Sequence, residues 1–416
     1  MSLPANGCDQ PGDNLLAYQP ALSRLLEFAR PIEQSERVPL LQALHRVLAE
    51  PLRSQLDVPP ADNSAMDGYA IQTRDLATSG VTRLKIQQRI AAGETGQPLQ
   101  PGHAARIFTG AVVPANTDAV IMQEKVSRHG DHIEFSNRPT AGANIRRAGE
   151  DIQREHVILR QGHRLAPQDL GLAASIGIAE LPVLRRMRVG TFFTGDELVE
   201  PGQPLAPGKI YDSNRFTLNG LLQSLGCEIV DLGIVGDTLE STRDAIERAS
   251  NSTDLVITSG GVSVGEEDHV RIALEQMGQL HMWRLGVKPG KPLAFGRVND
   301  TAFIGLPGNP VSVFATFCLF VAPYIKKCQG RSHYLNHPIR MRCAFDWPRP
   351  DKRREFVRVR LSDDDHAERS VTLYPNQGSG VLTSASWADG FIEVPENTPV
   401  TNGDYLNYYP FIEIMN

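Results

Sequence analysis

The sequence predicts a multidomain protein of the α/β plus β class, and three observations support this. The 416 residues exceed the usual size of one domain and indicate two to four domains. Strand and helix patterns alternate from residue 186 to 333, which is typical of a mostly parallel sheet with helices on both faces. Short β-prone stretches between Gly and Pro turns occupy residues 52–139 and 334–416. We therefore expect a central three-layer α/β domain, with a small β domain before it and a compact β domain after it.

Residues 15–51 and 140–185 are expected to form one discontinuous, helical linker domain. Apolar residues repeat at helical spacing from Leu22 to Ala29 and again from Leu40 to Leu48, which predicts two helices. A third helix is predicted at residues 167–175. The small β domain lies between these segments, with strands predicted at 84–90, 104–108, 119–122 and 132–135.

The central domain begins with a strand at residues 188–193. The helix expected at 213–225 has Asp212 or Ser213 as its N-cap and ends at Gly226. A final long helix is expected to begin near Pro310, which suits a first helical position. The other predicted elements are strands at 227–232, 255–258 and 281–287, helices at 239–249 and 268–277, and C-terminal strands at 339–343, 355–361, 370–374 and 391–394.

Composition excludes several classes of protein. The formal net charge of −6 argues against a nucleic-acid binder. The cysteines are odd in number and contain no C-x-x-C pair, which argues against a disulfide framework and favours a reducing cytoplasm. The N-terminal stretch lacks the order of a signal peptide, and the longest apolar stretch, 311–325, is interrupted and too short to cross a bilayer. We expect a cytoplasmic protein that binds neither nucleic acid nor a membrane.

Acidic residues follow three strands of the predicted sheet. Glu197 with Asp196 follows the first strand, Asp237 the second and Asp268 the third, so all should reach the carboxyl edge where ligands of such sheets bind. Carboxylates gathered in one cleft repel each other unless a cation lies among them, and oxygen ligands on separate loops suit Mg²⁺. The alternative is that Asp237 and Asp268 only cap the helices that follow them.

Two further loops at this edge suit anions. The glycine-rich loop 259–265, which includes Ser259, Gly260, Gly261, Ser263 and Gly265, would bring backbone N–H groups close to a phosphate. It lacks the order of a P-loop, and a tight structural turn explains it equally well.

The second loop, 288–292, holds Lys288 and Lys291 between prolines and a glycine, and would meet an oxyanion with point charges. An ordinary solvated turn is the alternative for either lysine.

Motifs spread along the chain resemble those of one enzyme family, molybdopterin molybdenumtransferase of the bacterial MoeA type, also found as the E domain of gephyrin. They occur in the order of the family and span nearly the whole chain. The matching motifs are DNSAMDGYA (62–70), RIFTGA (106–111), NIRRAGED (144–151), TGDEL (194–198), IYDSN (210–214), SGGVSVG (259–265), KPGKP (288–292) and LPGNP (306–310).

The resemblance implies a C-terminal β-barrel and a homodimer whose site is shared between the α/β domain of one subunit and the β domain of the other. It implies insertion of molybdate into adenylyl-molybdopterin with release of AMP, and the adenylyltransferase, molybdoenzyme apoproteins or their chaperones as possible partners. The site residues carried over by motif are Asp67, Thr109, Asp151, Glu197, Asp237, Asp268, Arg284, Lys288, Pro307, Pro310 and Ser379.

Our hypothesis divides these residues by charge. Glu197, Asp237 and Asp268 would hold Mg²⁺, and Asp67 or Glu197 would orient the nucleophile, a choice that the sequence leaves open. The groups expected to hold the oxyanions are Arg146, Arg147, Lys288, Lys291 and the amides of loop 259–265.

Two positions depart from the family. Phe193 stands where the family often has serine, and Arg284 stands where a related protein has lysine. Two other functions are alternatives. A molybdopterin adenylyltransferase would consist of the α/β domain alone, and a non-catalytic, gephyrin-like scaffold would not need acidic and basic groups at one edge of the sheet.

Overall fold

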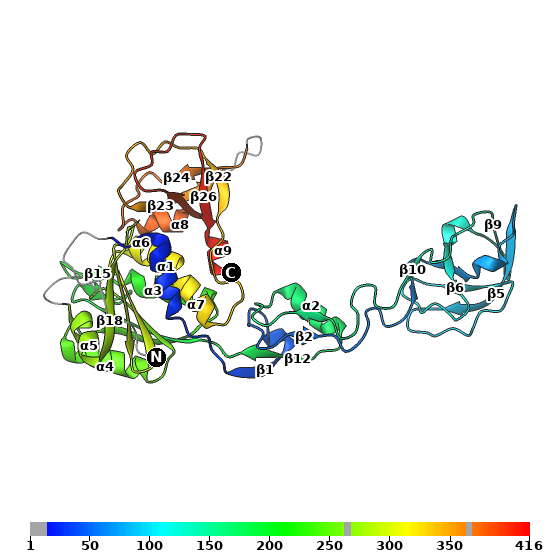
Figure 1. The fold of residues 1–416 in the computed structure, drawn as a ribbon, viewed down its shortest axis with the longest axis horizontal. Coiled ribbons are helices and arrows are strands. Elements are labelled where there is room, and N and C mark those ends of the chain that lie inside the picture. Colours follow the sequence, from blue (N-terminus) through cyan, green and yellow to red (C-terminus); the bar gives the residue numbers. More distant parts are fainter. Residues whose placement is uncertain (1–14, 262–267, 363–367) are drawn as a thin grey trace.

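The protein is elongated. The computed structural model describes residues 15–261, 268–362 and 368–416. The α/β domain and the C-terminal barrel lie together at one end, a slender linker domain follows, and the small β domain lies at the far end (Figure 1). The chain passes through the linker twice, once on the way to the β domain and once on the way back.

A six-stranded sheet forms the centre of the α/β domain. Its order is β16 (Glu228–Val235), β13 (Arg188–Thr194), β17 (Leu255–Ser259), β21 (Thr301–Leu306), β20 (Pro292–Val298) and β18 (Gly278–Arg284). The first four strands are parallel, and β20 is antiparallel to both of its neighbours. The edge strand β18 therefore points the same way as the parallel strands. The mostly parallel sheet is confirmed, and the carboxyl ends of five strands share one edge.

Helices cover both faces of this sheet. On one face pack α3 (Ser213–Ser224) and a long helix composed of α6 (Pro310–Thr316), η4 (Phe317–Val321) and α7 (Ala322–Cys328). On the other face pack α4 (Leu239–Ser250) and α5 (His269–Met277). Neighbouring residues of β13 serve the two cores, with Phe193 in the first and Phe192 in the second. This is the three-layer arrangement that the sequence predicts.

The hairpin of β20 and β21 was not predicted. We expected no strand between residue 287 and the helix at Pro310, but two strands turn there at Asn299, which has a φ of +52°. Asn tolerates this left-handed conformation, so Asn299 suits the tight turn between the two apolar strands.

The long helix Pro310–Cys328 is more continuous than expected. Within the described residues it is the one helix with the length and composition to cross a membrane. However, most of it is buried inside the protein, as expected for a core helix.

The N-terminal helix α1 (Tyr18–Glu27) packs with the α/β domain. Its buried side chains, among them Leu22 and Leu25, belong to the same core as α3 and α7. This differs from our expectation that residues 15–51 would contribute to the linker domain as a whole.

The second predicted helix, at 40–48, is wrong. The chain instead forms β1 (Ser35–Pro39), one turn of 3₁₀ helix, η1 (Leu40–Gln42), and a turn at His45, whose φ is +63°. Leu41 is 91% exposed, so the apolar spacing does not mark a buried face.

The linker domain is built from both passes of the chain. β1 pairs with β12 (Glu180–Leu184), β2 (Leu52–Arg53) pairs with β11 (Val157–Leu159), and α2 (Pro167–Ser175) packs beside them, at the residues predicted.

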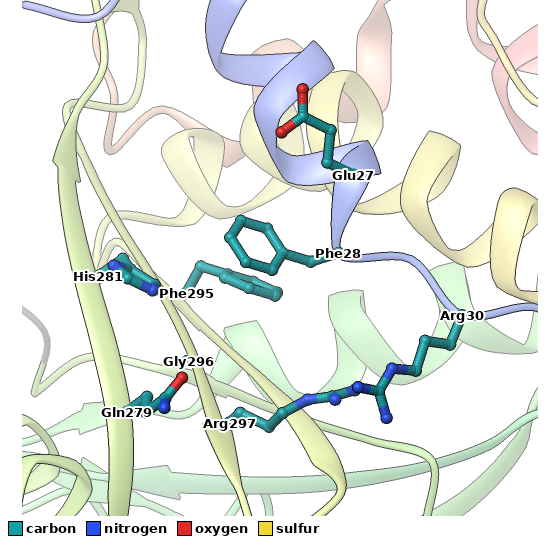
Figure 2. Close-up of a pocket in the computed structure, with 8 residues that line it drawn as sticks. All are labelled: Glu27, Phe28, Arg30, Gln279, His281, Phe295, Gly296 and Arg297. Atoms are coloured by element: carbon teal, nitrogen blue, oxygen red, sulfur yellow. The ribbon is translucent and has the colours of Figure 1, made fainter. Parts of the chain in front are cut away.

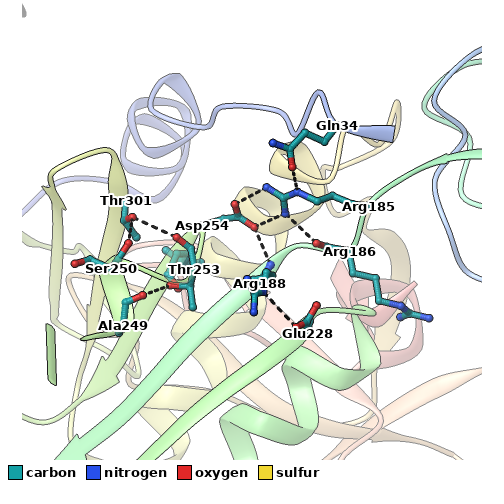
Figure 3. A network of polar contacts seen from close by, with 11 residues as sticks. Gln34, Arg185, Arg186, Arg188, Glu228, Ala249, Ser250, Thr253, Asp254 and Thr301 are labelled. Atoms are coloured by element: carbon teal, nitrogen blue, oxygen red, sulfur yellow. Dashed lines mark hydrogen bonds and ion pairs between the residues drawn. The ribbon is translucent and has the colours of Figure 1, made fainter. Parts of the chain in front are cut away.

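A polar network fixes the base of the linker to the α/β domain (Figure 3). Arg185 donates two hydrogen bonds of 2.8 Å to Asp254 and a third to Gln34, on the outgoing pass. The backbone N–H of Arg188 also donates to Asp254 at 2.8 Å. Burial alone would raise the pKa of Asp254, but these hydrogen bonds lower it overall.

The small β domain is a six-stranded sheet. Its order is β7 (Ala119–Met122), β4 (Gly68–Ile71), β6 (His103–Ile107), β5 (Thr82–Ile90), β9 (His132–Phe135) and β8 (Ser127–His129). The four predicted strands are present, and β4 and β8 are additional. At its base, β3 (Asn63–Ser64) pairs with β10 (Ile145–Arg146).

The C-terminal domain is a small closed barrel. Its ring runs through β23 (Arg354–Leu361), β24 (Ser370–Leu373), β22 (Ile339–Cys343), β26 (Tyr405–Pro410) and β25 (Gly390–Val394), and β25 closes it by pairing with β23. A short strand of the basic loop, β19 (Val287–Lys288), pairs with β23 and joins the barrel to the α/β domain. The helices α8 (Leu382–Trp387) and α9 (Phe411–Met415) were not predicted.

Candidate functional site

A pocket of about 520 Å³ lies at the carboxyl edge of the α/β sheet, against the barrel. Its walls come from the ends of β17 and β21, from the basic loop after β18, and from the barrel segment around residue 378. Six of the predicted site residues line it: Gly260, Gly261, Lys288, Lys291, Pro307 and Ser379. The structure therefore brings together residues from three strand ends and a second domain.

The glycines at the end of β17 are required by the backbone. Gly260 and Gly261 have φ values of +88° and +61°, and a Cβ atom on Gly261 would lie 2.7 Å from a methyl group of Val270. Ser259, the last residue of β17, is buried. The N–H of Gly260 donates to the carbonyl oxygen of Leu306, at 3.2 Å. The N–H of Gly261 is therefore the amide of this pair that could meet an oxyanion at the pocket wall. Ser263 and Gly265, also predicted in this loop, lie outside the described residues.

The two lysines of the basic loop differ in their surroundings. The Nζ atom of Lys288 lies 3.0 Å from a carboxylate oxygen of Glu355 and 3.4 Å from one of Asp351, both at the barrel. Lys291 is exposed and has no carboxylate within 4 Å among the described residues. Lys291 is thus the cation of this loop that is available to a ligand.

Two predicted carboxylates lie near the end of β13. The hydroxyl group of Thr194 donates a hydrogen bond of 2.8 Å to Asp237, which is half-buried. Glu197 folds back over Gly195, because a Cβ atom on that glycine would lie 2.8 Å from its carboxylate. Thr194 therefore contacts Asp237, and the next residue, Gly195, contacts Glu197. Asp237 does not cap the helix that follows it, since the N-cap of α4 is Thr238.

Asp268 occupies a different environment. It is 4% exposed and is the N-cap of α5, where its side chain accepts a hydrogen bond from the N–H of Arg271. Asp268 therefore does what the alternative interpretation proposed, because it caps the helix that follows it.

The acidic residues of the described ranges do not form a ready-made metal site. Among the residues that the structure describes, no group of three or more His, Cys, Asp or Glu side chains is placed to hold a metal ion. Mg²⁺ commonly takes only one or two protein carboxylates and completes its shell with water and substrate phosphates. The accessible Asp237 and Glu197 fit such a metal, and the part that the sequence predicts for Asp268 remains a prediction.

A second group of predicted residues lies in the small β domain. One carboxylate oxygen of Asp67 accepts hydrogen bonds from the backbone N–H of Thr109, at 2.8 Å, and from its hydroxyl group, at 2.9 Å. These two bonds, aided by the charge of Arg106, hold the pKa of Asp67 below its usual value. Asp67 is therefore ionised at neutral pH.

The arginine-rich segment lies at the base of the same domain. Arg146, Arg147 and Asp151 are exposed, and Arg147 donates a hydrogen bond of 2.6 Å to Asp62. Asp62 also accepts a hydrogen bond from the N–H of Ala148. This hydrogen bond and, to a lesser extent, the contact with Arg147 lower the pKa of Asp62. Arg146 has no such carboxylate within the described part of the chain, so it is the more available of the two cations.

The predicted site residues thus fall into two groups within one chain. The α/β group lies at the edge of the central sheet, and the β-domain group lies beyond the linker, at the other end of the molecule (Figure 1). Arg284 is exposed at the end of β18, and Pro310 is the first residue of α6. Phe193 is fully buried in the core, so a side chain at this position does not face either group.

Sequence reasoning missed several residues of the pocket. Ser312, Arg353 and Gln377 line it, and Thr194 holds Asp237. Arg353 and Gln377 come from the barrel, whose contact with the sheet edge has no local signal in the sequence. Thr194 could have been found, because it ends a buried strand beside the acidic pair.

Another pocket, of about 350 Å³, lies away from all predicted site residues. Figure 2 shows it between the end of α1 and the face of β18 and β20. The rings of Phe28 and Phe295 are 4.8 Å apart there, and Arg30 and Arg297 lie at its rim. We assign it no role in the chemistry.

Comparisons with known proteins agree along the whole chain. Residues 16–177 match the MoeA N-terminal region (domain I and II), residues 190–327 a probable molybdopterin binding domain, and residues 340–411 the MoeA C-terminal region (domain IV). The molybdopterin molybdenumtransferase of Haemophilus influenzae is 41% identical over 405 residues, which cover 96% of this chain and 100% of that protein. Molybdopterin molybdenumtransferase 2 of Mycobacterium tuberculosis is 36% identical over 91% of this chain and 95% of its own length. A crystal structure of a molybdopterin biosynthesis MoeA protein from Pyrococcus horikoshii has a TM-score of 0.82 at 31% identity, covering 95% of this chain and 100% of that one.

Proposed function

The chain belongs to the MoeA family of molybdopterin molybdenumtransferases, enzymes of molybdenum cofactor biosynthesis, and from this premise we propose how its residues divide the reaction. The substrates are adenylyl-molybdopterin and molybdate, and the products are molybdenum cofactor and AMP. The observation that carries this assignment is the pocket at the sheet edge, which gathers six residues predicted from motifs far apart in the sequence.

The α/β pocket receives the phosphate end of the substrate. The backbone N–H of Gly261 and the exposed cation Lys291 lie at this pocket and suit a pyrophosphate. Ser379 and Arg353 close it from the barrel. Asp237 and Glu197 would hold Mg²⁺ delivered with the phosphates, and such a metal neutralises charge that develops on phosphate oxygens.

Release of AMP requires hydrolysis of the P–O–P bridge. A water oxygen attacks one phosphorus atom, the bond from that phosphorus to the bridging oxygen breaks, and a carboxylate receives the proton of the water. We assign this proton to Glu197. Two hydrogen bonds from Thr109 fix the carboxylate of Asp67 in place, so we assign Asp67 the orientation of the nucleophile instead.

Both groups of residues act together only if two chains combine. Asp67 and Thr109 lie across the linker from the α/β pocket of their own chain, so we propose a homodimer in which each β domain completes the site of its partner. The dimer would work in the cytoplasm, receiving its substrate from the adenylyltransferase and passing its product to molybdoenzyme apoproteins or their chaperones.

Mixed dimers test this proposal. Asp67→Asn and Asp237→Asn each disable one half of every site, so each variant alone should release almost no AMP. After subunit exchange at equal amounts, about half of the dimers are mixed and each has one intact site, which predicts about a quarter of the wild-type turnover. Verified exchange without any restored AMP release would contradict the shared site. Activity retained by Asp237→Asn alone would contradict the role of the α/β pocket.

A further inference from the structure

Two arginines stand side by side in the small β domain. Arg89 on β5 and Arg106 on β6 are direct partners in the register of these parallel strands. Like charges in this position destabilise a sheet. A feature that breaks a rule of sheet stability is expected mainly at functional sites.

An aromatic ring holds the pair. The guanidinium carbon of Arg89 lies 4.6 Å, and that of Arg106 4.5 Å, from the ring centroid of Phe108. Each contact of this kind stabilises by about 0.5–1 kcal/mol at an exposed site. Phe108 therefore keeps two positive charges on one patch of surface.

The two arginines differ in how firmly they are fixed. Arg106 donates hydrogen bonds to the carbonyl oxygen of Gly68, at 2.9 Å, and to the side chain of Gln123, at 2.6 Å. Arg89 is exposed, and no carboxylate lies within 4 Å of it in the part of the chain that the structure describes. Hydrogen bonds thus hold the guanidinium group of Arg106 in place. The guanidinium group of Arg89 is exposed and available to bind an anion.

This patch borders the Asp67–Thr109 group. Phe108 directly precedes Thr109, and the carbonyl group that Arg106 contacts belongs to Gly68, the residue after Asp67. The charge of Arg106 reaches the Asp67 carboxylate and helps to keep it ionised. The β-domain half of the site therefore contains cations beside its carboxylate. These cations suit the substrates, which are anions.

We infer that Arg89 and Arg106, held over Phe108, bind a tetrahedral oxyanion of the substrates in the site that the partner chain's α/β pocket completes. The inference rests on the proposed shared site. The oxyanion is either a phosphate of the adenylylated pterin or molybdate, which share the charge and geometry that a guanidinium pair recognises.

Steady-state kinetics of the dimer identify the ligand. Arg89→Gln should raise KM about tenfold, the loss of one charge-assisted hydrogen bond, while kcat changes less. A higher KM for the adenylylated pterin would identify its phosphate as the bound oxyanion. A higher KM for molybdate would identify molybdate as the bound oxyanion. Arg89→Lys should recover part of the affinity. Arg83→Gln is the matched control, because Arg83 is an exposed arginine of the same strand that pairs with Glu134. Unchanged KM values for Arg89→Gln, or equal changes in the control, would overturn the inference.

Mixed dimers separate this inference from the shared site itself. In a mixture of Asp67→Asn and Asp237→Asn subunits, the restored site uses the β domain of the Asp237→Asn subunit. Adding Arg89→Gln to that subunit should raise the KM of the restored activity, and adding it to the Asp67→Asn subunit should not. A shift that follows the wrong subunit overturns the role of Arg89. A parent mixture without restored activity overturns the shared site instead, and the KM of the Arg89→Gln homodimer still tests oxyanion binding.

Discussion

Replacing Lys288 with methionine should weaken the joint between the α/β domain and the barrel, although the sequence places this lysine among the substrate ligands. Its ammonium group lies 3.0 Å from Glu355, a carboxylate that is only 3% exposed. Methionine keeps the length of the side chain but leaves that carboxylate without its cation. The two donors that remain are the indole N–H of Trp347, at 2.8 Å, and the N–H of Asp351, at 3.1 Å.

The size of the effect follows from burial. Breaking a fully buried pair costs about 3–5 kcal/mol, and breaking an exposed pair costs at most about 1 kcal/mol. Lys288 itself is 41% exposed, while Glu355 is buried, so we expect a loss of about 2 kcal/mol. Lys291→Met is the matched control, because it removes an exposed lysine of the same loop and should change stability by at most about 0.5 kcal/mol.

Hydrogen exchange at the amides of β23, together with urea unfolding, measures this loss. Adding Glu355→Gln to Lys288→Met should return part of the stability, because a neutral amide needs no cation. Equal exchange in Lys288→Met and Lys291→Met, or no recovery in the double variant, would refute the reasoning.

The pH dependence gives a second check on the same joint. Hydrogen bonds from Arg353, with help from Lys288, hold the pKa of Asp351 well below its usual range. A depressed carboxylate pKa stabilises the fold above the unfolded pKa of about 4, and that stability is lost as the pH falls through the folded pKa. The difference in stability between the wild type and Lys288→Met should therefore shrink as the pH is lowered below about 4.

Three other changes have defined outcomes. Gly261→Ala should lower the melting temperature and AMP release together, because its φ of +61° and the 2.7 Å approach to the next helix leave no room for a methyl group; normal melting would contradict this. Asp254→Asn should cost about 1–3 kcal/mol in urea unfolding, since it weakens the paired hydrogen bonds from Arg185; an unchanged midpoint would show that this pair does not hold the linker. Thr194→Val should reduce kcat while leaving the fold intact by circular dichroism, because it frees Asp237 to turn away; a wild-type kcat would remove Thr194 from the site.

The α/β domain was readable from the sequence because its signals are local. Strands of apolar residues end at turns, and caps such as Asp212 mark the helix starts, so β13, α3 and α4 lie within a few residues of their predicted positions. The apolar spacing after Leu40 failed for the opposite reason. That segment pairs with residues more than a hundred positions away, Val47 with Arg164 and Leu48 with Val183, and this long-range pairing overrode the local pattern.

The candidate site was only partly readable. Motif spacing identified the pocket residues that end strands, such as Gly261 and Lys291. It did not reveal that Lys288 is paired with the barrel or that Asp268 is a buried cap. Those facts depend on which side chains from distant segments meet at the same edge, and a single sequence carries no record of such contacts.

The position of α1 has a consequence for the order in which the chain folds. This helix and the nearby Ile32 complete a core whose other members begin at Met187, so residues 33–186 must form a closed excursion before α1 can dock. Closing so long a loop costs conformational entropy, and this cost is largest when the loop is unstructured. The pairing of Ser35 with Leu184 brings the two ends of the excursion together first. We therefore expect the linker to assemble before α1 packs, so that an early segment of the chain joins its core among the last.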